Sequence, residues 1–342
     1  MFPDLPEGGH TVVYSTVDSH DVKLDYYLPR TTGNLPAMIY YHGGGMSAGS
    51  RRGRGLPQWM YDHCQEKGYI FISADYRLCH PSNAIDQIDD AKALFSYIGG
   101  PQFASELPES VSLDTSRIAV TGFSAGAYSA RAACLYATPK PAALLSVYGL
   151  GGNMLLDHWT RARPPTSLAK FFDLSAVPAL LADKTVISDD FVEGGMSKRF
   201  ALTIDWEIKG TFLDGVFQRE GLGKLLDAVP AERRFEAVPE DLKPGMLQEF
   251  VKEDYPPSVF VHGKSDEVVS PDESVYQHEQ LEKLGVPSQL YLVENGPHGL
   301  EGAIMRRKMA GVQIPGDDKA VADSMEAYGK AMVFIDGIFN SV

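Results

Sequence analysis

The chain has 342 residues, of which 44% are hydrophobic and 22% are charged, as is ordinary for a globular protein. Its formal net charge of −14 makes nucleic acid and anionic membrane surfaces unfavourable partners, because like charges repel. No apolar run approaches the roughly 20 residues needed to cross a bilayer. Residues 1–10 lack the basic and apolar regions of a secretory signal, and an odd number of cysteines, three, predicts free thiols. We therefore expect no membrane span and a cytoplasmic location.

Eight short runs predict β-strands. Residues 10–18 and 22–29 alternate apolar and polar side chains on either side of a Ser-His-Asp turn, which is typical of a hairpin. The other six runs are almost continuously apolar and are bounded by Gly or Pro, as in parallel strands buried on both faces. They cover residues 37–42, 69–75, 117–122, 143–149, 257–263 and 289–296.

Stretches with helical spacing alternate with these strands. They cover residues 55–67, 83–98, 125–137, 272–284 and 320–339. Because strand and helix alternate, we predict an α/β fold with a mostly parallel eight-stranded sheet that is flanked by helices and carries the hairpin at one edge.

The alternation is interrupted between residues 151 and 255. This segment has turn clusters and scattered aromatic residues, and it contains no run that resembles the sheet strands. We predict a core domain made of residues 1–150 and 256–342. Residues 151–255 form a mostly helical insertion, a cap or lid, between the sixth and seventh strands.

The most specific motif is Gly122-Phe123-Ser124-Ala125-Gly126, which lies directly between a predicted strand and a predicted helix. A G-x-S-x-G motif in this context predicts a tight turn that holds the serine hydroxyl at the carboxyl edge of the sheet. The helix N-terminus behind Ser124 offers backbone N–H groups and a positive dipole end to a developing oxyanion.

A second motif, His42-Gly43-Gly44-Gly45, follows the third strand. Consecutive glycines allow backbone N–H groups to converge on one point, so we predict that Gly43 and Gly44, together with Ala125, form an oxyanion hole. We expect His42 to order this loop. The chain lacks the glycine-rich phosphate-binding motifs, which argues against a nucleotide site.

A serine nucleophile needs a base, and His298 lies in a loop just past the last strand, at the same edge as Ser124. His80 and His158 also lie in loops and are not excluded by position. We interpret His262, at a strand end, as a structural histidine. For the acid that orients the base, we predict Asp266, immediately after the seventh strand.

These motifs, together with Asp75-Tyr76-Arg77-Leu78 and His262-Gly263-Lys264-Ser265-Asp266, resemble those of the hormone-sensitive-lipase-like group of α/β-hydrolases, which are carboxylesterases and lipases. The resemblance implies an eight-stranded sheet and a triad of Ser124, Asp266 and His298. The chain departs from the group at Phe123, where an acidic residue is common, and after Leu78, where Ala-Pro-Glu usually follows.

We therefore expect a serine hydrolase that cleaves a carboxylic ester of a small, apolar substrate through an acyl-enzyme, with no metal or organic cofactor. One alternative keeps the triad for amide or formamide hydrolysis, acyl transfer, or lactone formation or opening in a small-molecule pathway. Another is a non-catalytic small-molecule receptor on the same fold. The sequence leaves the oligomeric state open.

Overall fold

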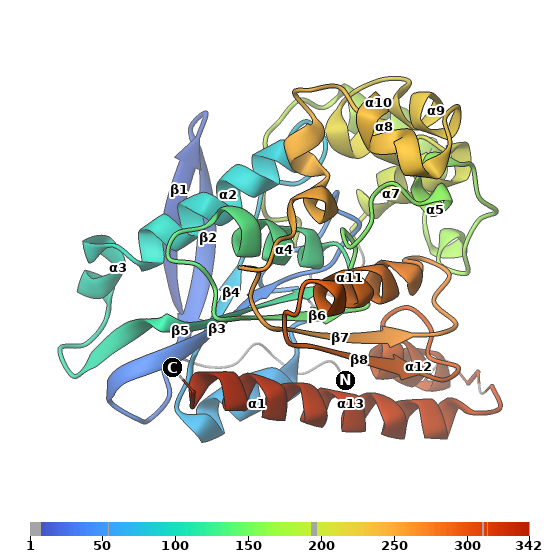
Figure 1. Cartoon of the computed structure of the whole chain (residues 1–342). Helices are drawn as coiled ribbons and strands as arrows, with labels where there is room; N and C mark the ends of the chain where they lie inside the picture. The colour runs from blue at the N-terminus through green and yellow to red at the C-terminus, as the bar shows by residue number, and fades with distance from the viewer. Residues whose placement is uncertain (1–7, 54, 193–196, 310, 313, 342) are drawn as a thin grey trace.

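The computed structural model describes residues 8–53, 55–192, 197–309, 311, 312 and 314–341. The expectation about a secretory signal concerns residues 1–10, of which residues 1–7 lie outside the described residues. All eight predicted strands are present in one sheet, in the order β1-β2-β4-β3-β5-β6-β7-β8 (Figure 1). Their bounds are His10–Val17 for β1, His20–Tyr27 for β2, Gly33–Tyr41 for β3, Ile70–Ala74 for β4, Val111–Phe123 for β5, Ala143–Val147 for β6, Ser258–Gly263 for β7 and Ser288–Val293 for β8. The predicted fold class is confirmed.

Strand direction agrees with the predicted burial of the side chains except in β8, a parallel edge strand in which only Val293 is buried. The hairpin of β1 and β2 is antiparallel and joins the sheet through an antiparallel pairing of β2 with β4, whereas β3 to β8 pair in parallel. Every residue of β4, β6 and β7 is buried, which explains their continuous apolar runs. Strand β5 begins at Val111, six residues earlier than predicted. Its first half is polar and pairs only with the start of β3, so it lacks the apolar run by which the strand was predicted.

Helices cover both faces of the sheet (Figure 1). One face carries α1 and α13, and the other carries α2, α4 and α11. The bounds are Gln58–Lys67 for α1, Ala84–Ile98 for α2, Gly126–Tyr136 for α4, Asp272–Lys283 for α11 and Asp317–Phe339 for α13. Two short helices were not predicted, namely α3 at Pro101–Glu106 and α12 at Leu300–Met309.

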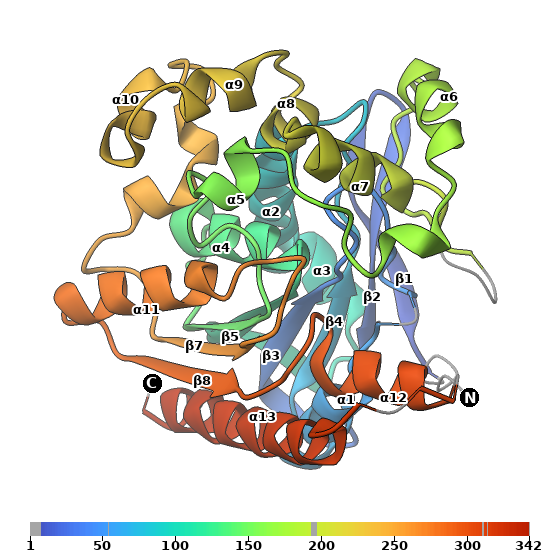
Figure 2. The ribbon, with the colours of Figure 1, turned by 90° about the vertical axis from the view of Figure 1, so that its right-hand side faces the viewer.

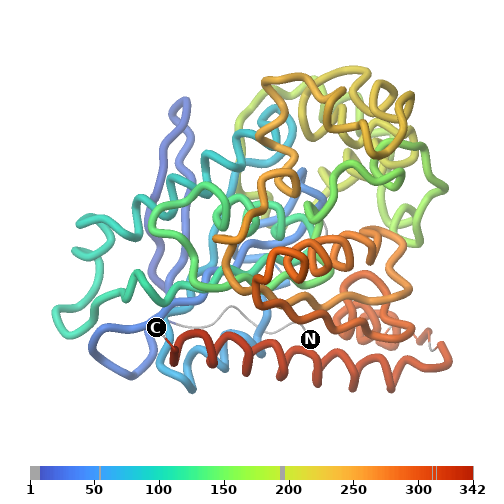
Figure 3. Tube along the Cα trace, in the orientation of Figure 1, coloured from blue at the N-terminus to red at the C-terminus, as the bar shows by residue number. Residues whose placement is uncertain are grey.

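In the described part of the segment between β6 and β7, all of the regular structure is helical, and loops join the helices. Its α-helices are α5 (Asp157–Thr160), α6 (Val177–Ala182), α7 (Phe200–Lys209), α8 (Phe212–Phe217), α9 (Leu222–Asp227) and α10 (Arg234–Ala237). Short 3-10 turns join them at Ala169–Phe171, Leu174–Ala176, Ala231–Arg233, Lys243–Gly245 and Leu247–Phe250. Figure 2 shows these helices on the side of the sheet that carries α2 and α4, and Figure 3 follows the chain out from β6 and back to β7.

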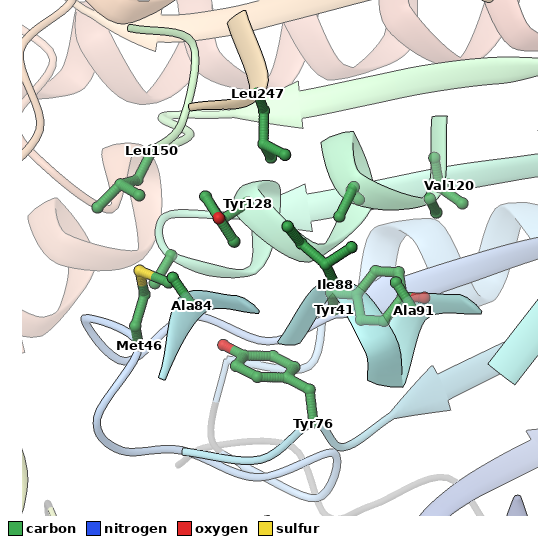
Figure 4. Close-up of a cluster of buried hydrophobic side chains, with 14 of the residues drawn as sticks. Tyr41, Met46, Tyr76, Ala84, Ile88, Ala91, Val120, Tyr128, Leu150 and Leu247 are labelled. Carbon is green, nitrogen blue, oxygen red and sulfur yellow. The ribbon is translucent and has the colours of Figure 1, made fainter. Parts of the chain in front are cut away.

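This segment shares a hydrophobic core with the sheet domain. Leu247 packs in one cluster with Tyr128 of α4 and Ile88 of α2 (Figure 4). The Tyr128 hydroxyl also donates a hydrogen bond to the carbonyl of Gly245 at 2.9 Å. Because apolar contacts run continuously from the sheet into the segment, the segment and the core pack as one unit.

Candidate active site

The chain turns sharply at Ser124, between the end of β5 and the start of α4. Ser124 has a φ of +51°, in the left-handed region that residues other than glycine seldom occupy. A Cβ atom on Gly122 would lie 2.2 Å from the Cα of Ala127, and one on Gly126 would lie 2.1 Å from the carbonyl oxygen of Tyr41. Both glycines of the motif are therefore required by close backbone contact.

The structure brings together the three residues predicted to form a triad. The Ser124 Oγ lies 2.9 Å from Nε2 of His298, and Nδ1 of His298 lies 2.7 Å from Oδ2 of Asp266. An ionised carboxylate only accepts hydrogen bonds, so Nδ1 carries the ring proton and Nε2 is left to accept from the serine hydroxyl. Asp266 follows β7 and His298 follows β8, so neighbouring parallel strands deliver both side chains to the edge where Ser124 lies.

The carboxylate of Asp266 receives further hydrogen bonds. Its Oδ1 accepts from the amides of Val268 and Val269 at 2.9 and 3.0 Å. Its Oδ2, which accepts from His298, also lies 3.2 Å from Nε2 of His262. Burial alone would raise the pKa of Asp266, but the His298 charge and the imidazole hydrogen bonds hold it well below its usual range. Asp266 is therefore ionised at neutral pH.

Two of the predicted oxyanion residues, Gly43 and Ala125, lie beside Ser124. A Cβ atom on Gly43 would approach the Ser124 Cβ to 3.1 Å, and Ala125 is the residue that precedes α4. Gly44 has a φ of +136°, and a Cβ there would lie 1.9 Å from the carbonyl oxygen of Ala48. In the described chain, no backbone hydrogen bond outside the regular elements uses the amides of Gly43, Gly44 or Ala125. The amides of Gly43 and Ala125, the two residues that adjoin Ser124, are therefore not used in such bonds.

His42 contacts its own loop. Its Nδ1 donates to the carbonyl of Gly43 at 2.9 Å, and its ring stacks on Tyr76 with centroids 4.4 Å apart. Burial lowers the pKa of His42 to about 4, so the ring is neutral at neutral pH. This placement matches the expectation that His42 orders the glycine loop.

The two other loop histidines bond elsewhere. His80 Nδ1 lies 2.6 Å from Oε1 of Gln218, and its Nε2 lies 2.8 Å from the Lys184 amine. His158 Nε2 donates to the carbonyl of Val268 at 2.8 Å. Among these loop histidines, His298 is the one that accepts the hydrogen bond from the Ser124 hydroxyl.

Helix α7 of the inserted segment contacts the glycine loop and carries a charged residue that the sequence reasoning missed. The Thr203 hydroxyl donates to the carbonyl of Gly45 at 2.8 Å and lies 2.7 Å from the Ser47 hydroxyl. One helical turn later, Glu207 Oε1 lies 3.1 Å from a guanidinium nitrogen of Arg163. A carboxylate and a guanidinium 44 positions apart leave no local sequence signal of their pairing.

The Arg163–Glu207 pair lies beside the Asp266 loop. Arg163 Nη1 donates to the carbonyl of Glu267 at 3.0 Å, next to Asp266. Burial raises the pKa of Glu207 to about 7, although the charges of Arg163 and His298 oppose this rise. The electrostatic environment of His298 and Asp266 therefore includes a carboxyl group from the inserted segment.

The described residues contain no group of three or more His, Cys, Asp or Glu side chains that could hold a metal ion. Within the same residues, no helix is both long and apolar enough to cross a membrane. Cys64, Cys79 and Cys134 are buried free thiols.

A serine on a strand-to-helix turn, with an acid and a histidine after later strands of a mostly parallel sheet, defines the α/β-hydrolase fold. Comparison with solved structures agrees. The propionate-bound esterase Est2 of Thermogutta terrifontis superposes with a TM-score of 0.56 and 20% identity over 96% of both chains. At this identity the likeness establishes the fold.

Similarity in sequence indicates the kind of enzyme as well as the fold. The BD-FAE family model matches residues 24–144. Carboxylesterase NlhH of Mycobacterium tuberculosis is 38% identical over 133 residues, which are 37% of each chain, so the match covers little more than a third of that protein. The non-reducing polyketide synthase ausA of Penicillium brasilianum is 24% identical over 318 residues, which are 84% of this chain and 13% of the synthase. These matches confirm the predicted resemblance to carboxylesterases of the α/β-hydrolase fold.

Proposed function

We propose that this protein is a serine-dependent esterase that cleaves a carboxylic ester of a small, apolar substrate through an acyl-enzyme. The observation that carries the proposal is the hydrogen-bonded chain from Ser124 through His298 to Asp266. The resemblance to a bacterial carboxylesterase supports the same reaction.

In the proposed mechanism, the Ser124 Oγ attacks the ester carbonyl while His298 takes the hydroxyl proton. The carbonyl oxygen becomes an oxyanion and accepts hydrogen bonds from the amides of Gly43, Gly44 and Ala125. When the C–O bond breaks, the leaving alcohol receives the proton from His298. Water then attacks the acyl-enzyme by the same route and releases the acid.

Residues 151–255 act as a cap in this proposal. Two sets of contacts support the assignment. Thr203 of α7 bonds to the glycine loop, and Arg163 and His158 bond to the loop that carries Asp266. A cap that excludes water would strengthen the electrostatic interactions around the reacting carbonyl.

A second candidate function is acyl transfer or lactone formation with the same triad. The similarity to a polyketide synthase over 84% of the chain favours it, because it places a related sequence within an enzyme of small-molecule synthesis. In this reaction a substrate hydroxyl, in place of water, attacks the acyl-enzyme. Turnover of a p-nitrophenyl ester in the presence of added alcohols separates the two reactions, since transfer yields a new ester and hydrolysis yields only the free acid.

Fluorophosphonate labelling and p-nitrophenyl ester hydrolysis test the proposed nucleophile. Ser124→Ala should lose the label and reduce turnover by roughly 10⁴-fold or more. Ser105→Ala, which removes an exposed hydroxyl from α3, should retain both. An unlabelled but folded wild-type protein would instead support the receptor alternative, and an active Ser124→Ala variant would mean that another group is the nucleophile.

The cytoplasmic location stays a prediction, to which the three buried thiols conform.

A further inference from the structure

A second hydrogen-bonded arm reaches Asp266 from the protein interior. His262 lies near the end of β7, and its Nε2 is 3.2 Å from Oδ2 of Asp266. Its Nδ1 is 2.8 Å from the Oγ of Ser274 in α11. Neither His262 nor Ser274 has any exposed surface, so this arm has no access to substrate.

The neighbours of the His262 ring determine which nitrogen carries the proton. Its Nε2 faces two acceptors, Oδ2 of Asp266 and the carbonyl oxygen of Val269, the latter at 3.1 Å. Nε2 is therefore the donor, and Nδ1 accepts from the Ser274 hydroxyl. Both ring nitrogens are used, which locks the orientation of the ring.

The two arms meet at one oxygen atom. Oδ2 of Asp266 accepts from Nδ1 of His298 and from Nε2 of His262, while Oδ1 accepts from two backbone amides. A carboxylate held by four N–H donors has little freedom to rotate, and part of its charge is neutralised before His298 becomes protonated.

We propose that His262 is a positioning residue for the reaction. Through its Nε2–H it fixes the Asp266 carboxylate in the orientation that His298 requires, and it limits the negative charge that His298 experiences. This inference rests on the proposed esterase function. It gives a mechanistic role to a histidine that the sequence indicated only as structural.

Other ionisable groups around the carboxylate bear on the pH dependence. Glu207 and Arg163 approach Asp266 from the inserted segment and form an ion pair. His158 also faces Asp266, and burial lowers the pKa of His158 to about 4, so this ring stays neutral near neutral pH. Burial keeps the pKa of Tyr148, which packs against the His298 ring, well above its usual range.

The test compares three variants by kcat, KM and the pH profile of p-nitrophenyl ester hydrolysis. His262→Leu removes the donor to Asp266. His262→Gln places an amide N–H near the same position and is the rescue variant. His278→Leu is the matched control, because His278 Nδ1 also lies 2.8 Å from a serine hydroxyl, that of Ser288, while Asp266 receives its imidazole hydrogen bonds from His262 and His298.

We expect His262→Leu to reduce kcat by about 10- to 100-fold with KM nearly unchanged, since small errors in the placement of reacting groups have costs of this order. The acidic limb of kcat/KM should move to higher pH, because a less neutralised carboxylate favours the protonated His298 ring. His262→Gln should restore most of both properties, and His278→Leu should change neither. Unchanged kcat and pH profile in His262→Leu, or equal losses in both His262 variants, would overturn the inference.

Nitrogen-15 NMR of the wild-type histidine rings provides a readout that needs neither turnover nor a folded variant. In the wild type, His262 should be protonated at Nε2 and unprotonated at Nδ1. Protonation at Nδ1 would overturn the inference even if His262→Leu fails to fold. Failure of the esterase proposal would show separately, as absence of fluorophosphonate label on wild-type Ser124.

Discussion

Replacing Glu207 by glutamine preserves the shape of the side chain and removes a buried charge beside the candidate site. Glu207 is 6% exposed and pairs with Arg163 at 3.1 Å. Despite this partner, burial raises the pKa of Glu207 from 4.5 to about 7. Between these values the folded protein binds a proton at Glu207 that the unfolded chain has already released.

The sign of the effect follows from this difference. A carboxyl group whose pKa is higher in the folded state makes the protein less stable as the pH rises from the unfolded to the folded value. Each tenfold change in proton affinity corresponds to about 1.4 kcal/mol, so Glu207 should cost the wild type about 3 kcal/mol between pH 4.5 and values above 7. Glu207→Gln cannot ionise. Its stability relative to the wild type should therefore increase by about 2 to 3 kcal/mol from pH 5 to pH 8.

Urea unfolding at pH 5 and pH 8, followed by tryptophan fluorescence, measures this difference, because comparison with the wild type at each pH cancels the other titrating groups. Glu232→Gln, which removes the same charge from an exposed position, is the control and should show a flat difference. A difference that is constant with pH for Glu207→Gln would refute the reasoning. So would a relative loss of stability at pH 8, which is the result expected if the Arg163 ion pair outweighed burial.

Two further substitutions test the local geometry of the site. Gly126→Ala would place a Cβ 2.1 Å from the carbonyl oxygen of Tyr41 and should abolish esterase activity or folding, as judged by turnover and circular dichroism. Gly329→Ala in α13, where no atom lies within 4 Å of the added methyl, should be tolerated or raise the melting temperature slightly. Equal tolerance of both substitutions would contradict the structure. Thr203→Val removes the hydroxyl that bonds to the carbonyl of Gly45 and should lower kcat about tenfold with a small loss of stability, since the glycine loop then loses a support. Wild-type kcat in Thr203→Val would show that the loop holds its shape without α7.

The sheet and the strand-to-helix turn could be read from the sequence because their signals are local. A strand buried on both faces must be apolar throughout, so the run at residues 143–149 identified β6 without knowledge of its neighbours. The polar first half of β5, which includes Asp114 and Ser116, gave no such signal, because its strand character comes from pairing with β3. Helix α12 was missed beside the His298 loop, where its hydrophobic pattern is weak.

Chain order and strand direction by themselves determined where Ser124, Asp266 and His298 lie. Each follows a parallel strand, and the carboxyl ends of parallel strands share one edge, so position in the sequence implied proximity in space. Only the tertiary structure decided which distant groups surround them. The approach of Thr203 to Gly45, and of Glu207 to Arg163, depends on the docking of the inserted segment. Such contacts result from side chains that share space without sharing a sequence pattern, and no periodicity or spacing in the chain encodes them.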